Sequence, residues 1–338
     1  MKVVGLDLGG TKIAAGVFDG KRLLSKVVVP TPKEGGERVA EALAEAAERA
    51  EREAGVRGEA IGLGTPGPLD FRRGVIRFAP NIPGVQDFPI RRILEEATGR
   101  PVFLENDANA AALAEHHLGA AQGEESSLYL TVSTGIGGGV VLGGRVLRGE
   151  RGQGGELGHL TLLPGGPACG CGLEGCLEAL AAGRALERDA TYAFQRPVDT
   201  RELFRLFQAG DPKAERLVLQ AARYVGIGLA SLVKAFDPGV VVLGGGVALN
   251  APEGYWEALL EAYRRYLQGW EAPPLRRARL GAEAGLLGAA LTAYLEVKDG
   301  SGYGPGLRRC LPSPPRAPPP LLPQALRLVR PPARGHPH

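Results

Sequence analysis

The sequence of 338 residues is poor in several residue types, and each shortage narrows the class of protein. It has no run of about 18 apolar residues, so we expect no membrane span. Residues 1–8 lack the charged segment, apolar core and cleavage site of an export signal. Of only four cysteines, three lie within eight residues, which favours metal binding over a disulfide framework. We therefore expect a cytoplasmic protein with no membrane partner.

The chain also lacks a large excess of charge of either sign. The formal net charge is +3 at pH 7, which predicts no nucleic-acid partner. The composition, 44% hydrophobic and 23% charged, is typical of a soluble globular protein, and the length is sufficient for two domains.

Strands and helices alternate along the chain. Apolar runs predict strands at residues 2–8, 13–18, 23–29, 60–63, 101–104, 128–133, 139–142, 240–243 and 275–280. Helical spacing predicts helices at residues 37–54, 91–98, 107–118, most of 185–236, 255–266 and 284–297. An opening β-meander in such a chain predicts an α/β fold with mixed sheets, and similar strand–glycine-loop units at Leu6 and Leu130 predict two similarly built halves.

The C-terminal segment differs from the rest. Residues 301–338 hold 11 of the 27 prolines and six arginines, with no acidic residue and no lysine. Residues 299–338 are therefore expected to form a disordered or extended tail.

Glycine-rich loops follow three of the predicted strands. They are Asp7-Leu8-Gly9-Gly10-Thr11-Lys12, Ser133-Thr134-Gly135-Ile136-Gly137-Gly138-Gly139 and Gly244-Gly245-Gly246. Glycine allows backbone N–H groups to approach a phosphate closely, and Asp7 could hold Mg²⁺ through water. An ordinary hairpin turn has the same composition, so each loop by itself leaves both interpretations open.

A polar segment, Glu105-Asn106-Asp107-Ala108-Asn109, joins a predicted strand to an Ala-rich helix. Asp107 could cap that helix. Alternatively, its carboxylate could accept a proton from a substrate hydroxyl group.

The pattern H-x9-C-x-C-x4-C is the most specific one in the chain. It consists of His159, Cys169, Cys171 and Cys176, a natural tetrahedral set for a structural Zn²⁺ ion, with a metal-free cysteine loop as the alternative. Glu156 and Glu178 flank this set. The metal loop could aim both carboxylates at one point, where they would accept hydrogen bonds from hydroxyl groups, or both could be solvated surface acids.

The order of these motifs over about residues 2–297 resembles that of the ROK family (repressors, open reading frames, kinases), most of all its bacterial glucokinases. The resemblance implies the actin-like ATPase fold of hexokinases, with two α/β domains around a cleft. Residues 1–106 would form a small domain, joined by a C-terminal helix at about 284–298. Residues 107–283 would form a large domain with the zinc-binding loop.

The resemblance also implies an activity, namely Mg²⁺-dependent transfer of a phosphoryl group from ATP to the 6-hydroxyl of glucose, a step of glycolysis. Family members are commonly dimers or tetramers. Asp107 resembles the catalytic base. Hexose contacts are implied for Gly67, Asn81, Asn106, Asp107, Glu156, His159 and Glu178. ATP contacts are implied for Asp7, Gly9, Gly10, Thr11, Lys12, Thr134, Gly135 and Gly245.

Three alternatives stay open within the family. The sugar could be fructose, mannose, allose or an N-acetylhexosamine, and the donor could be polyphosphate. The family also contains sugar-sensing repressors with a DNA-binding domain ahead of the first glycine motif. Here that motif begins at residue 7, which favours a kinase. Ser133 stands where the family usually has glycine, which affects only fine geometry.

Overall fold

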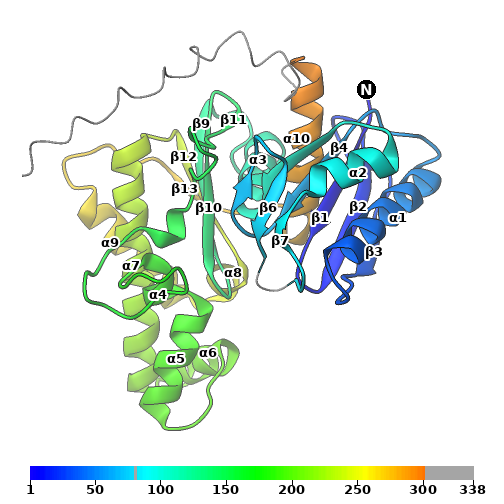
Figure 1. Ribbon diagram of the computed structural model, residues 1–338. Coiled ribbons are helices and arrows are strands. Elements are labelled where there is room, and N and C mark those ends of the chain that lie inside the picture. The colour runs from blue at the N-terminus through cyan, green and yellow to red at the C-terminus, as the bar shows by residue number, and fades with distance from the viewer. Residues whose placement is uncertain (80–81, 301–338) are drawn as a thin grey trace, which may run out of the picture. The chain divides into compact units, whose positions relative to one another are not determined.

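The computed structural model describes residues 1–79 and 82–300, and its framework is two five-stranded mixed sheets (Figure 1). The first sheet has the order β3-β2-β1-β4-β8, with bounds β1 Val3–Leu8, β2 Lys12–Phe18, β3 Val27–Pro30, β4 Ile61–Thr65 and β8 Val102–Asn106. The second has the order β11-β10-β9-β12-β13, with bounds β9 Ser126–Val132, β10 Ile136–Leu142, β11 Arg145–Val146, β12 Val240–Gly244 and β13 Leu275–Arg277.

Both sheets are built in the same way. In each, an antiparallel meander of three strands is extended by two strands parallel to the first. The predicted α/β fold with mixed sheets and two similarly built halves is thus confirmed.

Register brings the ends of the parallel strands together. Asp7 on β1 pairs with Gly64 on β4, and Thr65 pairs with Asn106 on β8. Thr131 on β9 pairs with Gly244 on β12 in the second sheet. Because the carboxyl ends of parallel strands share one edge, the predicted motif residues gather there, where ligands of α/β proteins usually bind.

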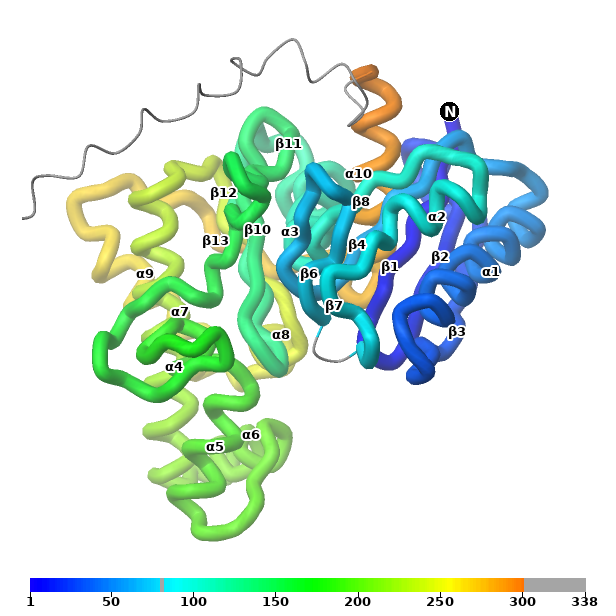
Figure 2. Tube along the Cα trace, viewed as in Figure 1, coloured from blue at the N-terminus to red at the C-terminus, as the bar shows by residue number. Residues whose placement is uncertain are grey.

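Three helices cover the first sheet, namely α1 Gly36–Ala54, α2 Ile90–Thr98 and α10 Ala284–Lys298 (Figure 2). Helix α10 returns from the far end of the sequence to pack on β1 and β4. Helix α3 Asp107–His117 packs between α10 and strands β9 and β10 of the second sheet. A Cβ at Gly62 would lie 1.8 Å from the Ala289 carbonyl oxygen, and one at Gly288 would lie 1.8 Å from that of Ala110. Only glycine allows this close approach of α10.

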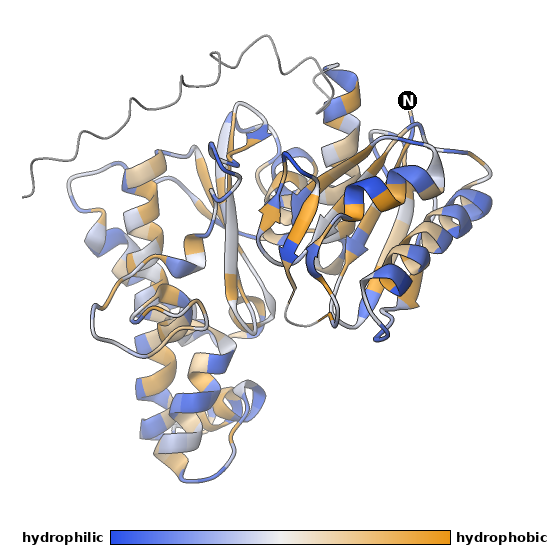
Figure 3. Ribbon diagram, in the orientation of Figure 1, coloured by the Kyte–Doolittle hydropathy of each residue, from blue (hydrophilic) through white to orange (hydrophobic). Residues whose placement is uncertain are grey.

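The remaining helices pack mainly with the second sheet or one another, except that η2 contacts α10. They are η1 Leu157–His159, α4 Leu177–Ala181, α5 Gly183–Phe194, α6 Thr200–Gln208, α7 Pro212–Phe236, α8 Gly246–Asn250, α9 Glu253–Tyr266 and η2 Gly281–Glu283. In the described part of the chain, α7 alone is long and apolar enough to cross a membrane. It packs against α9, α4, α5 and α6 within the hydrophobic core, as a core helix of a globular protein does (Figure 3).

Several details differ from the sequence prediction. The strand predicted at 23–29 begins only at Val27, and before it Ser25 Oγ, a side-chain atom, accepts the hydrogen bond of Val17 N–H (3.2 Å). The strand predicted at 275–280 ends at Arg277. A small antiparallel sheet was missed, formed by β5 Leu69–Asp70, β6 Val75–Phe78 and β7 Gln86–Phe88. Its strands are too short to give an alternating pattern.

Two predictions remain as they were. The division into a small and a large domain near residue 106 stays a prediction. Asn81, Cys310 and nearly all of the tail predicted at 299–338 lie outside the described residues.

Candidate active site and metal centre

The corner between β8 and α3 presents the predicted base. The Asn106 side chain caps α3, since its Oδ1 accepts hydrogen bonds from the N–H groups of Ala108 (3.0 Å) and Asn109 (3.4 Å). Asp107 is therefore the first helical residue and not the cap, and its carboxylate is exposed. Surrounding protein nevertheless removes part of its hydration, and this raises the pKa of Asp107, with a further contribution from the charge of Glu156.

Asp7 lies at the end of β1 in the same neighbourhood. Burial and, secondarily, the charge of Asp107 raise the pKa of Asp7 to about 6, although the Lys12 ammonium acts in the opposite direction. The charge of Asp107 thus contributes to the raised pKa of Asp7, and the charge of Glu156 contributes to the raised pKa of Asp107. Mutually repelling carboxylates at a strand edge are typical of sites that bind a cation or a proton-donating ligand.

The first glycine loop is held by its carbonyl groups. Gly9 N–H donates to the Lys12 carbonyl (2.9 Å), and Thr31 Oγ1 donates to the Gly9 carbonyl (2.7 Å). Lys33 Nζ donates to the Gly10 carbonyl. The side chains of Thr11 and Lys12 are left exposed. Thr31 and Lys33 were missed by the sequence prediction, because no local pattern links them to a loop some 20 residues earlier.

The second glycine loop borders a pocket of about 750 Å³. Two carbonyl groups of the loop, those of Ser133 and Thr134, accept hydrogen bonds from Gly183 N–H (2.8 Å) and Arg184 N–H (3.1 Å) at the start of α5. The pocket is lined by Ser133, Thr134, Gly183, Glu187, Asp199, Thr200, Arg201, Phe204, Arg205, Gln208, Gly246, Val247 and Asn250. The lining from α5 and α6 gave no sequence signal, because it comes from ordinary amphipathic helices.

Gly245 joins β12 to α8 beside this pocket. Its φ is +92°, and a Cβ there would lie 2.2 Å from the Val132 carbonyl oxygen. Both the backbone conformation and the close approach of β9 require glycine. Gly67 is similar, with φ +88° and a Cβ position 1.8 Å from the Phe78 carbonyl oxygen.

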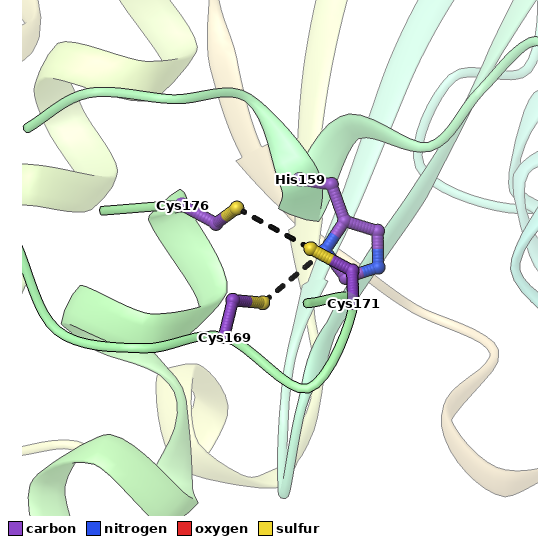
Figure 4. Close-up of side chains that lie close together, drawn as sticks. All are labelled: His159, Cys169, Cys171 and Cys176. Atoms are coloured by element: carbon purple, nitrogen blue, oxygen red, sulfur yellow. Dashed lines mark hydrogen bonds between the residues drawn. The ribbon is translucent and has the colours of Figure 1, made fainter. Parts of the chain in front are cut away.

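His159, Cys169, Cys171 and Cys176 converge as predicted (Figure 4). Their four ligand atoms all lie within 4.8 Å of one another. Cys171 and Cys176 Sγ are 3.7 Å apart, and Cys169 Sγ lies 3.5 Å from His159 Nδ1. A tetrahedral zinc site has edges of about 3.8 Å between sulfurs and about 3.5 Å between sulfur and nitrogen, as its bond lengths require. The residues therefore fit one Zn²⁺ ion.

Glu178 connects this metal loop to the second glycine loop. Its Oε2 accepts a hydrogen bond from Ile136 N–H (2.9 Å), and a Cβ at Gly135 would lie 2.6 Å from the same oxygen. Glu156, by contrast, contributes through its charge to the raised pKa of Asp107. Convergence of both glutamates on one ligand stays a prediction.

Known proteins resemble most of the chain. The profile of the ROK family matches residues 3–295. The glucokinase of Streptomyces coelicolor is 38% identical over 311 residues, covering 85% of this chain and 96% of that protein. The N-acetylmannosamine kinase of Haemophilus influenzae is 33% identical over 309 residues, covering 90% and 100%.

Solved structures similar to this chain come from the same family. The ROK hexokinase from Thermus thermophilus is 99% identical, with a TM-score of 0.87, and covers 88% of this chain and 100% of its own. A ROK glucokinase from Streptomyces griseus, in complex with glucose and AMPPNP, is 37% identical with a TM-score of 0.71, covering 86% and 98%. The chain therefore belongs to the ROK family and has the actin-like ATPase fold.

Proposed function

We propose that this ROK-family hexose kinase transfers the γ-phosphoryl group of ATP to the 6-hydroxyl of glucose. The observation that carries the proposal is the exposed Asp107 carboxylate, whose raised pKa makes it a better proton acceptor than an ordinary aspartate. Glucokinase relatives and the Streptomyces griseus complex with glucose and AMPPNP support the choice of sugar and donor.

Asp107 would take the proton of the attacking hydroxyl group. Asn106 caps the helix, and although Asp107 Oδ1 accepts a hydrogen bond from Ala108 N–H (2.7 Å), the exposed Asp107 carboxylate can still face a ligand. Hexose hydroxyls would be bound by Asn106, Glu156, His159 and Glu178, with Gly67 and Asn81 beside them. Phosphoryl transfer depends mainly on positioning and charge neutralisation. The principal requirement at the sugar-binding half of the site is therefore a carboxylate fixed next to the sugar.

ATP would lie along the two glycine loops. Gly9, Gly10, Thr11 and Lys12 would contact its phosphates, and Thr134, Gly135 and Gly245 would contact phosphate and adenosine. The 750 Å³ pocket beside Thr134 is of a size suited to a nucleoside. Mg²⁺ would neutralise phosphate charge, and Asp7 would hold it through water, which would relieve the repulsion between Asp7 and Asp107.

Zinc would be structural. The side chains of His159, Cys169, Cys171 and Cys176 would fill all four positions of the tetrahedron, which would leave none for a substrate. The ion would fix the segment from η1 to α4, and with it Glu178 and the glycine loop to which Glu178 is hydrogen-bonded.

An N-acetylhexosamine is the second candidate substrate, since the Haemophilus influenzae relative is an N-acetylmannosamine kinase. A sensor without kinase activity is less well supported, because the residues expected at both glycine loops are retained. We also propose a cytoplasmic location, a homo-oligomer and closure of two domains on the substrates, all on the family resemblance.

The test is an ADP-release assay with Mg-ATP against glucose, fructose, mannose, allose, N-acetylmannosamine and N-acetylglucosamine. We expect kcat/KM to be highest for glucose. A higher value for an N-acetylhexosamine would change the substrate but keep the roles above. Tight glucose binding without turnover on any sugar would contradict the kinase.

Replacing Glu156 with Gln is expected to move the acid limb of the kcat/KM profile to lower pH. The Glu156 charge contributes to the raised pKa of Asp107, so its removal lets Asp107 stay ionised, and active as a base, in more acidic solution. The profile for glucose is measured over the pH range in which the enzyme stays folded. Glu150→Gln is the control, because Glu150 is an exposed acid in the same segment, paired with Arg72 at 2.9 Å. An acid limb that shifts equally in both variants would contradict a specific coupling.

A further inference from the structure

Glu105 and Asn109 flank the Asp107 corner, but the proposed reaction assigns them no role. Both are buried in the structure, Glu105 completely and Asn109 with 4% of its surface exposed. A buried carboxylate is costly unless it is paired and fully hydrogen-bonded. Its partners therefore indicate what Glu105 is for.

Glu105 ties together the residues around the base. Its Oε1 accepts hydrogen bonds from Asn106 N–H (3.0 Å) and from Asn109 Nδ2 (3.2 Å). Its Oε2 accepts one from Arg148 Nε at 2.7 Å. Glu105 thus fixes the backbone of Asn106, the residue before Asp107, and the Asn109 side chain in the first turn of α3, and Arg148 in turn fixes Glu105.

Arg148 is itself held from two further sides. Its Nη1 donates to Glu296 Oε1 of α10 (3.1 Å), and its Cζ lies 5.6 Å from the centre of the Phe71 ring. The loop that follows it packs on the same ring, since a Cβ at Gly152 would lie 2.3 Å from Phe71. The guanidinium therefore joins α10, the Phe71 segment and β8.

The same loop leads to Glu156 and returns to α3. A Cβ at Gly155 would lie 2.8 Å from Asn109 Oδ1, so the backbone next to Glu156 packs directly on this side chain. Arg148 and Asn109 thus hold the loop at both ends against the strand and helix that carry Asp107. A shift of this loop or of β8 would change the distance between the base and the sugar-binding segment.

We propose that Arg148 is a positioning residue for phosphoryl transfer, which acts through Glu105 to hold Asp107 in register with the Glu156 segment. This inference rests on the proposed kinase function. The planar guanidinium is suited to it, because it offers Nε to one carboxylate and Nη1 to another in a fixed geometry. A lysine ammonium keeps the charge but cannot reproduce that fork.

Arg148→Met is compared with Arg145→Met. Arg145 lies on β11, three residues before Arg148, and pairs with Asp299 at the end of α10. Like Arg148 it therefore joins this part of the chain to the C-terminal helix, but through an exposed contact that does not involve Glu105. Because small misplacement of reacting groups is expensive, we expect Arg148→Met to lower kcat for glucose by roughly 10²-fold. The dissociation constant of glucose should change by less than about tenfold. Arg145→Met should leave kcat within about twofold, and Arg148→Lys should recover part of the loss.

A buried, unpaired Glu105 could by itself disturb the fold of Arg148→Met. The double variant Arg148→Met with Glu105→Gln removes that charge and is expected to fold, as followed by urea unfolding, yet to keep the low kcat. Recovery of wild-type kcat in the double variant would overturn the positioning role, as would full kcat in folded Arg148→Met. If the wild-type protein phosphorylates no sugar, the proposed function fails instead.

Discussion

Asp107→Asn is expected to lower kcat for glucose by roughly 10³-fold while leaving the glucose dissociation constant within about tenfold. The amide keeps a side-chain oxygen that can accept the Ala108 N–H hydrogen bond, which is 2.7 Å long in the native protein. It also keeps nearly the same volume, so the β8–α3 corner should be preserved. What is lost is the ability to accept a proton from the 6-hydroxyl group. Turnover is measured by ADP release and glucose binding by calorimetry.

Asp211→Asn is the matched control for this variant. Asp211 also stands at a helix N-terminus, where its Oδ1 accepts hydrogen bonds from Lys213 N–H (2.8 Å) and Ala214 N–H (3.0 Å). Asparagine caps helices as well as aspartate does, so kcat should be unchanged. Equal losses of turnover and of glucose binding in Asp107→Asn would indicate a structural role for this carboxylate.

Cys176→Ser is expected to abolish zinc binding and to lower kcat by roughly 10²-fold through displacement of the segment that carries Glu178. Cys176 is completely buried, and its Sγ lies 3.7 Å from Cys171 Sγ within the set of four ligand atoms. Structural zinc contributes directly to folding free energy, and the unfolding temperature should fall as well. Zinc per chain is measured by elemental analysis, and unfolding by calorimetry.

Cys310→Ser provides the control, since it is the same substitution at the one cysteine that is not a predicted ligand. It should retain about one zinc ion per chain and full activity. Loss of zinc from Cys176→Ser with unchanged kcat and stability would mean that the metal loop does not support the active site. Equal loss of zinc in both variants would contradict the predicted ligand set.

Local sequence patterns were sufficient for most elements of the fold. Helical spacing predicted the major helices, and runs of apolar residues predicted every strand of the two large sheets except β11. Both signals are local, because backbone preference and the burial of one face act over a few neighbouring residues. The set of His159, Cys169, Cys171 and Cys176 was equally readable, since its ligands lie on one short loop. Their chemistry specifies a metal without reference to the rest of the chain.

Other features depended on tertiary structure alone. The sequence left open whether Asp107 caps α3. The structure gives that role to Asn106, whose Oδ1 accepts hydrogen bonds from the N–H groups of both Ala108 and Asn109, whereas Asp107 Oδ1 accepts one from Ala108. The sequence could not pair Glu105 with Arg148 or Arg148 with Glu296, which are 43 and 148 residues apart in the chain. No local pattern indicated that Glu178 Oε2 accepts a hydrogen bond from Ile136 N–H of the glycine loop.

The reason is physical. A hydrogen bond or ion pair between distant residues depends on where packing places their backbones, and the same residue types are solvated when packing places them elsewhere. The sequence by itself therefore determined the elements, the metal ligands and the motifs at the ends of the strands. Only the folded chain decided which carboxylates affect one another, which glycines permit close packing, and how Arg148 is placed against Glu105.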